Sequence, residues 1–308
     1  MKKKIYFWAS DISNNSGEGI LANSFIKNYK KNKSVEFINI SNNDINQKKN
    51  NFRKYKNRYD SIYHKYFHPF KGIYKLWIYH LKKEKVCYIN YLPLWNFLIF
   101  FLLPANTLLG PITGSIDRKF TSMFFFSTFE RLSLLIVKKK KLDIIFSHNF
   151  YLKKYNLSKK KYKSNFILQD FFYRKKNKIK NFDLIVYYRK DSKLNEKYII
   201  NLIQKLVKIN LKIAVIGNRI KYRTVKNFGY ISRDKSISII SQTNYALANP
   251  ENLYSYFVQD CLSNQLTVFY NIFFKKFNIM NNKKMVPILF KSYNQDFKII
   301  KKNIKKLK

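Results

Sequence analysis

Two cations in the second half of the chain have the types and position to do chemistry. Arg189 and Lys193 directly follow a strand predicted at residues 183–188. A planar guanidinium and a compact ammonium at the carboxyl end of a strand suit a diphosphate group. The competing interpretation is that both are ordinary solvated side chains, because lysine is abundant along the whole chain.

Two acids, Glu251 and Asp260, lie further along the chain. On one helix, residues nine positions apart would point to opposite sides, at about 100° per residue. Pro250 disfavours helix at the residue before it, so we expect Glu251 in a loop and Asp260 on the helix that follows. The loop acid could hold sugar hydroxyls, the helical acid a ribose diol, and the helix N-terminus a phosphate. Alternatively, Glu251 and Asn252 only cap that helix.

Glycine is scarce, with seven in 308 residues, so those that remain are expected where no side chain fits. Two glycine loops follow strands predicted at residues 5–10 and 107–109, and the first loop opens a helix. The carboxyl ends of strands are where open α/β sheets bind ligands. The loop residues of interest are Gly17, Gly19, Gly110, Pro111 and Gly114.

Several other signals are missing from the sequence. It has no cluster of cysteine and histidine with metal-ligand spacing, no Asp-x-Asp pair and no G-x-S-x-G nucleophile motif, so we expect no metal at the site. Of the four histidines, only His148 follows a predicted strand near a cleft. Cys87 and Cys261 fall in predicted buried elements, which indicates free thiols in a reducing compartment.

The helices and strands that must position these residues are predicted to alternate along the chain, in two runs separated by a basic linker at residues 173–181. Such alternation favours parallel, doubly wound sheets. We therefore predict an α/β protein with a Rossmann-like domain at residues 1–175, a second at residues 182–290, and a C-terminal helix at residues 291–308. The two domains are expected to face a central cleft that holds the ligand.

The net charge of +44 suggests that the protein binds nucleic acid. However, the abundant residues Lys, Asn, Ile, Phe and Tyr share AT-rich codons, and the basic residues are scattered rather than gathered in one tail. The longest apolar run, residues 92–104, is shorter than the roughly 20 residues of a membrane-spanning helix. Residues 1–10 form too short an apolar run for a signal peptide and read as a first core strand.

Taken together, four segments resemble a GT-B glycosyltransferase, close to the GT4 type of retaining enzymes. They are residues 16–19, 109–114, 188–193 and 249–260. The segments occur in the order that the family shows, across roughly residues 5 to 270, the span of the α/β alternation. The second acid is Asp260 where the family has glutamate, and it lies one residue further along. The same acidic segment also resembles the inverting GT10 fucosyltransferases.

The resemblance implies a metal-independent hexosyltransferase that needs no cofactor and uses a UDP- or GDP-linked sugar as donor substrate. Arg189, Lys193 and Glu251 would be catalytic: the cations would stabilise the departing diphosphate, and Glu251 would orient the donor sugar. Further donor-binding residues would be Gly17, Gly19, Asn252 and Asp260. The acceptor cleft would include Gly110, Pro111, Gly114 and His148.

The implied acceptor is a surface glycan or a lipid-linked sugar, which indicates a role in polysaccharide biosynthesis. An anionic membrane is a further candidate partner, because the basic surface and the apolar residues 92–103 could dock there. We therefore expect a cytoplasmic protein, with peripheral attachment to the inner membrane face as a candidate location. Three alternatives stay open: an inverting, fucosyltransferase-like enzyme, a degenerate transferase without turnover, and a basic nucleic-acid-binding protein without catalysis, although nucleic acid is not the partner we expect.

Overall fold

The structure is a computed structural model of the 308-residue chain. It divides into two compact units, Met1–Asp170 and Phe171–Lys308, and each is described by itself. The residues that the structure describes are 3–12, 17–32, 35–41, 67–92, 94–112, 120–146, 152, 155–158, 163–164, 179–189, 196–250, 255–277 and 283–305.

The first unit is built on a parallel six-stranded sheet with the order β2-β1-β3-β4-β5-β6. Its strands are β1 (Lys3–Ala9), β2 (Val35–Asn39), β3 (Val86–Leu92), β4 (Leu108–Ile112), β5 (Asp143–Phe146) and β6 (Lys163–Ser164). The chain builds outward from β1 in both directions, with β2 on one side and β3 on the other. This is a doubly wound sheet, as the alternating sequence pattern predicts.

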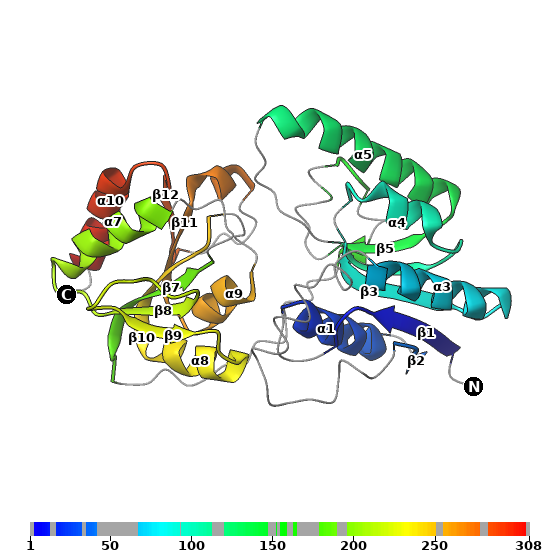
Figure 1. Cartoon of the computed structure of the whole chain (residues 1–308), viewed down its shortest axis with the longest axis horizontal. Coiled ribbons are helices and arrows are strands. Elements are labelled where there is room, and N and C mark those ends of the chain that lie inside the picture. The colour runs from blue at the N-terminus through cyan, green and yellow to red at the C-terminus, as the bar shows by residue number, and fades with distance from the viewer. Residues whose placement is uncertain are drawn as a thin grey trace. The chain divides into compact units, whose positions relative to one another are not determined.

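In the described part of the first unit, four helices pack around the sheet or on one another (Figure 1). They are α1 (Gly17–Asn32), α3 (His68–Leu81), α4 (Phe97–Leu102) and α5 (Phe120–Lys139). Helix α1 packs on the face that carries Ile5 and Phe7 of β1, whereas Tyr79 of α3 stacks on Tyr6 at 4.4 Å between ring centroids. Because successive side chains of a strand point to opposite faces, α1 and α3 lie on opposite sides of the sheet.

Strand β4 corrects one of our predictions. The sequence predicts that this strand ends at residue 109 and that Gly110 and Pro111 lie in a loop, but β4 continues to Ile112 and both residues are buried within it. A Cβ atom at Gly110 would overlap the ring of Phe25. The glycine therefore allows helix α1 to pack closely on the sheet, and this packing accounts for its presence.

The second unit also has a parallel six-stranded sheet, with the order β12-β11-β10-β7-β8-β9. Its strands are β7 (Phe182–Tyr188), β8 (Ile213–Gly217), β9 (Lys226–Gly229), β10 (Thr243–Leu247), β11 (Thr267–Asn271) and β12 (Met285–Ile288). The chain runs from β7 to β8 and β9 on one side, then returns to place β10 against the other side of β7. The strand order therefore reverses between β7 and β10.

Helices cover both faces of this second sheet as well (Figure 1). They are α7 (Glu196–Val207), α8 (Arg233–Ser241), α9 (Tyr256–Ser263) and α10 (Tyr293–Lys305), with a 3₁₀ helix η4 (Ile272–Phe277). Helices α7 and α10 pack together over the face that carries Leu184, Val186 and Tyr188. Phe257 of α9 packs on Tyr187, at 5.5 Å between rings, so α9 covers the opposite face.

Helix α10 is held to the second unit by a buried carboxylate. Asp296 accepts hydrogen bonds from the backbone N–H groups of Leu289 at 2.7 Å and Phe290 at 2.8 Å. It also accepts one from the Tyr198 hydroxyl of α7 at 2.5 Å. Burial and this carboxylate both raise the pKa of Tyr198. These bonds tie α10, α7 and the end of β12 into one core.

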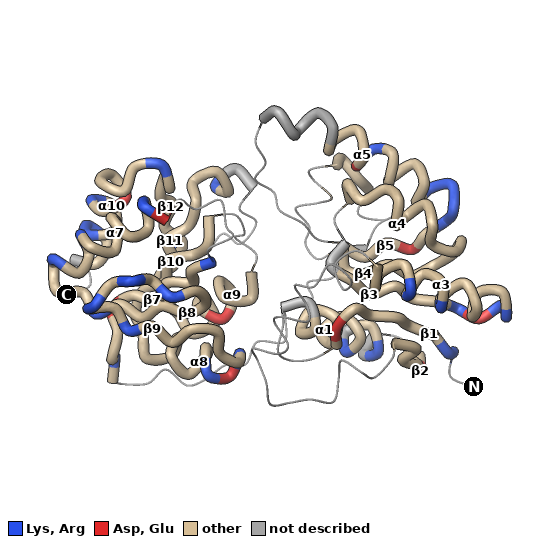
Figure 2. The backbone as a smooth tube through the Cα atoms, viewed as in Figure 1, with Lys and Arg blue, Asp and Glu red and all other residues tan. Residues whose placement is uncertain are grey.

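Two general properties of the structure agree with what the sequence predicts. Lysine and arginine are spread over both units (Figure 2), as the scattered sequence pattern predicts. Both cysteines, Cys87 and Cys261, are buried and unpaired, which confirms the prediction of free thiols. No helix in the described part of the chain is long and apolar enough to cross a membrane.

Candidate functional site

The best-placed candidate site lies where the strand order of the second sheet reverses. Leu247 of β10 pairs with Val186 of β7, and Tyr188 of β7 pairs with Gly217 of β8. All three strands are parallel, so their carboxyl ends meet at one edge of the sheet. Open α/β sheets bind ligands outside this edge at the point of reversal. Arg189 and the residues after β10 therefore come to the place where a ligand is expected.

Arg189 lies at this edge among polar side chains from neighbouring strands. Burial raises the pKa of Tyr187, while the positive charge of Arg189 acts to lower it and nearby Tyr230 acts to raise it. The Tyr230 hydroxyl donates a hydrogen bond to Oδ1 of Asn218 at 2.7 Å. The exposed Arg189 side chain, the Tyr230 phenol and the Asn218 amide thus lie just past the carboxyl ends of β7, β9 and β8. This arrangement suits an anionic ligand that carries hydroxyl groups.

The backbone at Gly217 sets the geometry of this edge. Its φ is +93°, and a Cβ atom there would overlap the carbonyl oxygen of Tyr188. The next N–H group, that of Asn218, donates to the same carbonyl at 2.8 Å. Only glycine adopts this conformation at so close an approach without strain. Gly217 thereby keeps Asn218 beside the end of β7.

The segment after β10 is tied to the neighbouring strand β11. The N–H group of Ala248 donates to the carbonyl of Phe269 at 2.9 Å, and the Asn271 side chain donates to the carbonyl of Pro250 at 3.2 Å. Helix α9 then begins at Tyr256, with Ser255 as its N-cap, so Asp260 lies on a helix after Pro250, as the sequence predicts. Because α9 follows the carboxyl end of β10, its N-terminus lies on the same side of the sheet as Arg189, and a helix N-terminus is suited to bind an anion.

Asp260 of α9 has a partner that the sequence does not predict. Its two carboxylate oxygens accept hydrogen bonds from Arg233 of α8, at 2.7 Å from Nη2 and 3.1 Å from Nε. The ring of Tyr256 lies 4.9 Å from the guanidinium. Burial raises the pKa of Asp260, and the bonds and charge of Arg233 oppose that rise only in part. The carboxylate thus joins α8 to α9, and its contact with a ribose stays a prediction.

The remaining predicted site residues are placed as follows. Gly17 is the first residue of α1, and Gly19 is buried in the first turn of that helix. Gly110 and Pro111 are buried in β4. The others lie outside the described residues: Lys193, Glu251, Asn252, Gly114 and His148. Among the residues that the structure does describe, no group of histidine, cysteine and acidic side chains could hold a metal ion.

The first unit has its own polar edge at the carboxyl ends of β1 and β3. The Ser10 hydroxyl donates to Oδ1 of Asn90 at 2.7 Å, and the Asn90 amide donates to the Tyr88 hydroxyl at 3.3 Å. Asp11, which is only 3% exposed, follows directly. The strand order reverses at β1, so this edge is the second place in the chain where a ligand is expected.

Sequence reasoning missed several polar residues at these two edges. They are Asp11, Asn90, Asn218, Tyr230 and Asn271. A signal was present for two of them: Gly217-Asn218 and Gly229-Tyr230 each place a glycine at the end of a strand and a polar residue after it. Both glycines have positive φ, so the chain turns at each and the polar side chain follows the turn.

Comparison with known proteins gives a fold. No protein-family model matches the sequence, and no curated protein matches it. Among solved structures, the glycotransferase of kitacinnamycin matches with a TM-score of 0.51 and 5% identity, over 99% of this chain and 91% of that chain. The chain has the GT-B fold. This confirms the predicted fold class of two parallel Rossmann-like domains.

Two further solved structures match almost the whole length of this chain. Escherichia coli heptosyltransferase WaaC, solved with ADP-2-deoxy-2-fluoro heptose, matches with a TM-score of 0.40 and 9% identity, over 99% of this chain and 100% of that one. The T4 phage β-glucosyltransferase matches with a TM-score of 0.47 and 13% identity, over 98% and 89%. The predicted likeness to the GT4 type within this fold stays a prediction.

Proposed function

We propose that the protein is a glycosyltransferase that uses a nucleotide-diphosphate sugar as its donor. The observation that carries the proposal is the carboxyl edge of the second sheet, where Arg189 follows β7 and the residues leading to α9 follow β10. A guanidinium and a helix N-terminus at such an edge match the charge of a diphosphate. The shared fold of a glycotransferase supports the same activity.

In this proposal, Arg189 and the first N–H groups of α9 stabilise the charge that grows on the leaving diphosphate. Lys193 stands four residues after Arg189, and Glu251 directly follows Pro250. We assign Lys193 to the diphosphate and Glu251, with Asn252, to the donor sugar. Asn218 and Tyr230 add polar groups at the same edge that could bind ribose or sugar hydroxyls.

We assign the acceptor to the first unit, where Ser10, Asp11 and Asn90 form the polar edge of the sheet and α1 begins at Gly17. A glycan or a lipid-linked sugar is the proposed acceptor, as expected from the sequence. Metal-independent transfer of a hexose with retention is the first candidate reaction, and inversion is the alternative. Asp11 would matter most in the inverting case, because a direct displacement needs a base for the acceptor hydroxyl.

Nucleotide binding tests the proposal directly. Thermal unfolding is followed with UDP, GDP and ADP, each in EDTA so that no divalent metal contributes. One of the three should stabilise the protein in a saturable way, by about 2.7 kcal/mol at about 100 times its dissociation constant. Arg189→Ala removes the cation at the sheet edge. This variant should need at least a tenfold higher nucleotide concentration to reach the same stabilisation.

The matched control is Lys226→Ala, which removes one exposed positive charge at the amino end of β9, away from the candidate site. This variant should bind the nucleotide as the wild type does. If no nucleotide shifts the melting temperature, or if both variants behave alike, Arg189 does not bind a diphosphate. A screen of sugar nucleotides for hydrolysis, followed by anomer analysis of the product, then separates retention from inversion and turnover from binding alone.

A further inference from the structure

Helix α3 carries a second apolar stripe that faces away from the sheet. Its buried side holds Gly72, Ile73 and Leu76. Six large hydrophobic residues on and just before the helix are exposed instead: Phe67, Phe70, Tyr74, Trp77, Ile78 and Leu81. At about 100° per residue, these six fall within an arc of about 100°, centred about 140° from the buried side. A helix on the surface of a water-soluble fold usually carries polar residues there.

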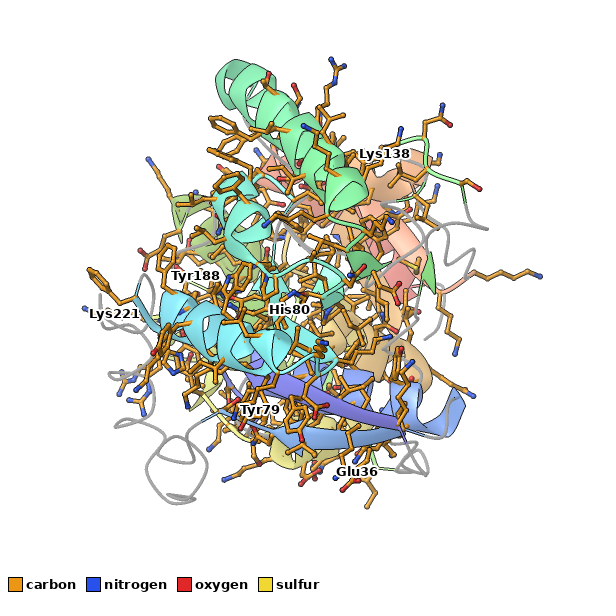
Figure 3. All side chains as sticks on the ribbon, turned by 90° about the vertical axis from the view of Figure 1, so that its right-hand side faces the viewer. Glu36, Tyr79, His80, Lys138, Tyr188 and Lys221 are labelled. Atoms are coloured by element: carbon orange, nitrogen blue, oxygen red, sulfur yellow. The ribbon has the colours of Figure 1, made fainter. Side chains whose placement is uncertain are left out.

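The exposed stripe continues across the two neighbouring helices. Trp95 and, on α4, Leu98 and Phe101 are exposed, as are Leu132 and Leu135 on α5. The three helices are in contact: the Trp77 indole N–H donates to the carbonyl of Leu102 at 2.8 Å, and the rings of Phe97 and Phe129 stack at 5.1 Å. Figure 3 shows α3, α4 and α5 next to one another. We call this layer the α3–α5 surface.

This concentration is specific to the α3–α5 surface. Of the fifteen exposed large hydrophobic residues in the described part of the chain, eleven belong to it and four lie elsewhere. Scattered single exposed hydrophobic residues need no explanation, but a continuous group of them marks an interaction surface. The exposed fractions of the eleven residues are 37 to 75%. Nothing in the described part of the chain therefore covers this surface.

Lysines border the apolar stripe at one end. The segments at the carboxyl ends of α3 and α5, residues 82–85 and 138–143, together hold seven lysines and two acids. Lys140 donates to the carbonyls of Phe101 and Leu103 and lies 5.4 Å from the Phe101 ring, while Lys82 lies 5.7 Å from the ring of Tyr79. Both helices end with these basic segments (Figure 2). Lys138 on α5 and Tyr79 on α3 are labelled in Figure 3.

We propose that the α3–α5 surface docks the protein on a membrane that contains anionic phospholipid. Tryptophan and tyrosine beside lysine are the side chains that favour the boundary between head groups and acyl chains. Lysines next to the inserted face add attraction to an anionic surface. This inference goes beyond the proposed function, since docking requires neither a nucleotide nor catalysis.

The charge of the chain disfavours a second copy as the occupant. In a two-fold dimer the same patch meets itself, so two chains that each carry a net charge of +44 would have to come together. With 61 basic and only 17 acidic residues, the chain offers few acids to compensate. A nucleic acid would use the lysines but leave the aliphatic residues Ile78, Leu81 and Leu135 without a partner. A bilayer satisfies both the lysines and the apolar residues.

Vesicle binding tests the proposal on the full chain. Vesicles of phosphatidylcholine alone are compared with vesicles containing about 30% phosphatidylglycerol, whose anionic head groups give the membrane a negative surface potential. We expect at least tenfold tighter binding to the anionic vesicles, weakened by salt. The chain has three tryptophans: Trp8 is buried, and Trp77 and Trp95 belong to the α3–α5 surface. Docking should therefore shift tryptophan emission to the blue and allow quenching by brominated lipid.

Two sets of variants separate the apolar and basic contributions. Tyr74→Ser with Leu81→Ser and Phe101→Ser should weaken vesicle binding at least tenfold without unfolding the protein, because all three side chains are exposed. Lys82→Glu with Lys138→Glu and Lys139→Glu should abolish the preference for anionic lipid. The controls lie in the second unit: Ile179→Ser with Ile272→Ser for exposed hydrophobic residues, and Lys208→Glu with Lys226→Glu and Lys302→Glu for charge.

Three results would overturn the proposal. Binding that is equally weakened by the second-unit controls would show a nonspecific effect of hydrophobicity or charge. A concentration-dependent dimer that only the apolar variant loses would identify the surface as a contact between copies. Vesicle binding that survives both first-unit variants would place docking elsewhere. Nucleotide stabilisation, measured on the same variants, keeps this test separate from that of the proposed transferase, since the α3–α5 surface is not part of the donor site.

Discussion

The ion pair between Arg233 and Asp260 allows a quantitative test of how the second unit holds its candidate site. The pair joins α8 to α9 through two hydrogen bonds, and the side chains keep only 16% and 5% of their exposure. Asp260→Asn preserves the shape of the side chain but removes its charge and one acceptor oxygen. Arg233 is then left as a largely buried cation against a neutral amide and the ring of Tyr256.

The expected cost follows from this burial. Removing one member of a buried ion pair destabilises a protein by about 3–5 kcal/mol. We expect the lower end, about 3 kcal/mol, because Arg233 still reaches some water and the asparagine oxygen can accept one of its bonds. Arg233→Met should cost a similar amount, since it leaves a buried carboxylate. The double variant should cost less than the two singles added together, with a coupling of about 2 kcal/mol.

The location of the tryptophans gives a sharp assay. All three lie in the first unit, at Trp8, Trp77 and Trp95, so tryptophan fluorescence during urea unfolding reports that unit alone. Far-ultraviolet circular dichroism reports the helices of both units. The Asp260 and Arg233 variants should shift a dichroism transition to lower urea while the fluorescence transition stays in place.

Two outcomes would refute this reasoning. Single variants that cost under about 1 kcal/mol, with no coupling, would mean that the pair behaves as an exposed salt bridge. An Asp260→Asn protein with wild-type stability but weaker nucleotide binding would instead support the predicted contact of Asp260 with a ribose. Unfolding of both units in one transition would require the variants to be compared by their midpoints alone.

Three further predictions concern other parts of the fold. Gly217→Ala should cost about 1–3 kcal/mol, because its φ is positive, and should also weaken nucleotide stabilisation in the thermal assay. Tyr198→Phe should cost about 1–3 kcal/mol in urea unfolding, because Asp296 loses a buried donor. Burial raises the pKa of the Cys87 and Cys261 thiols, so Ellman's reagent at pH 8 should react slowly with the native protein and rapidly with two thiols after denaturation.

The alternation of helices and strands predicts both sheets, because each strand must return parallel to the last with a helix on one face. The order of the strands does not follow from alternation alone. Arg189 and Pro250 share an edge because β10 returns to the free side of β7. The prediction that Arg189 stands at a strand end is therefore local, whereas its proximity to Pro250 depends on which way the chain crosses.

The reasons why a position requires glycine divide in the same way into local ones and ones that depend on residues far away in the sequence. Gly217 stands at the end of a strand, and a positive φ there is a local property that the sequence pattern indicates. Gly72 follows no predicted strand, and the structure places it under the ring of Trp8, which a Cβ atom would overlap. Gly110 likewise accommodates Phe25. These partners are far away in sequence, so only the fold reveals why a side chain cannot be present.

The acids show why residue type alone could not identify the site. In a chain with 61 cations and 17 acids, a carboxylate has many possible partners, and nothing local selects Arg233 for Asp260. Four acids are buried in the described part of the chain: Asp11, Glu130, Asp260 and Asp296. Asp260 and Asp296 tie helices together, so burial of an acid in the second unit reflects structure there. Asp11 differs in position, because it alone of the four follows a strand at the reversal of its sheet, where a buried carboxylate can meet a ligand.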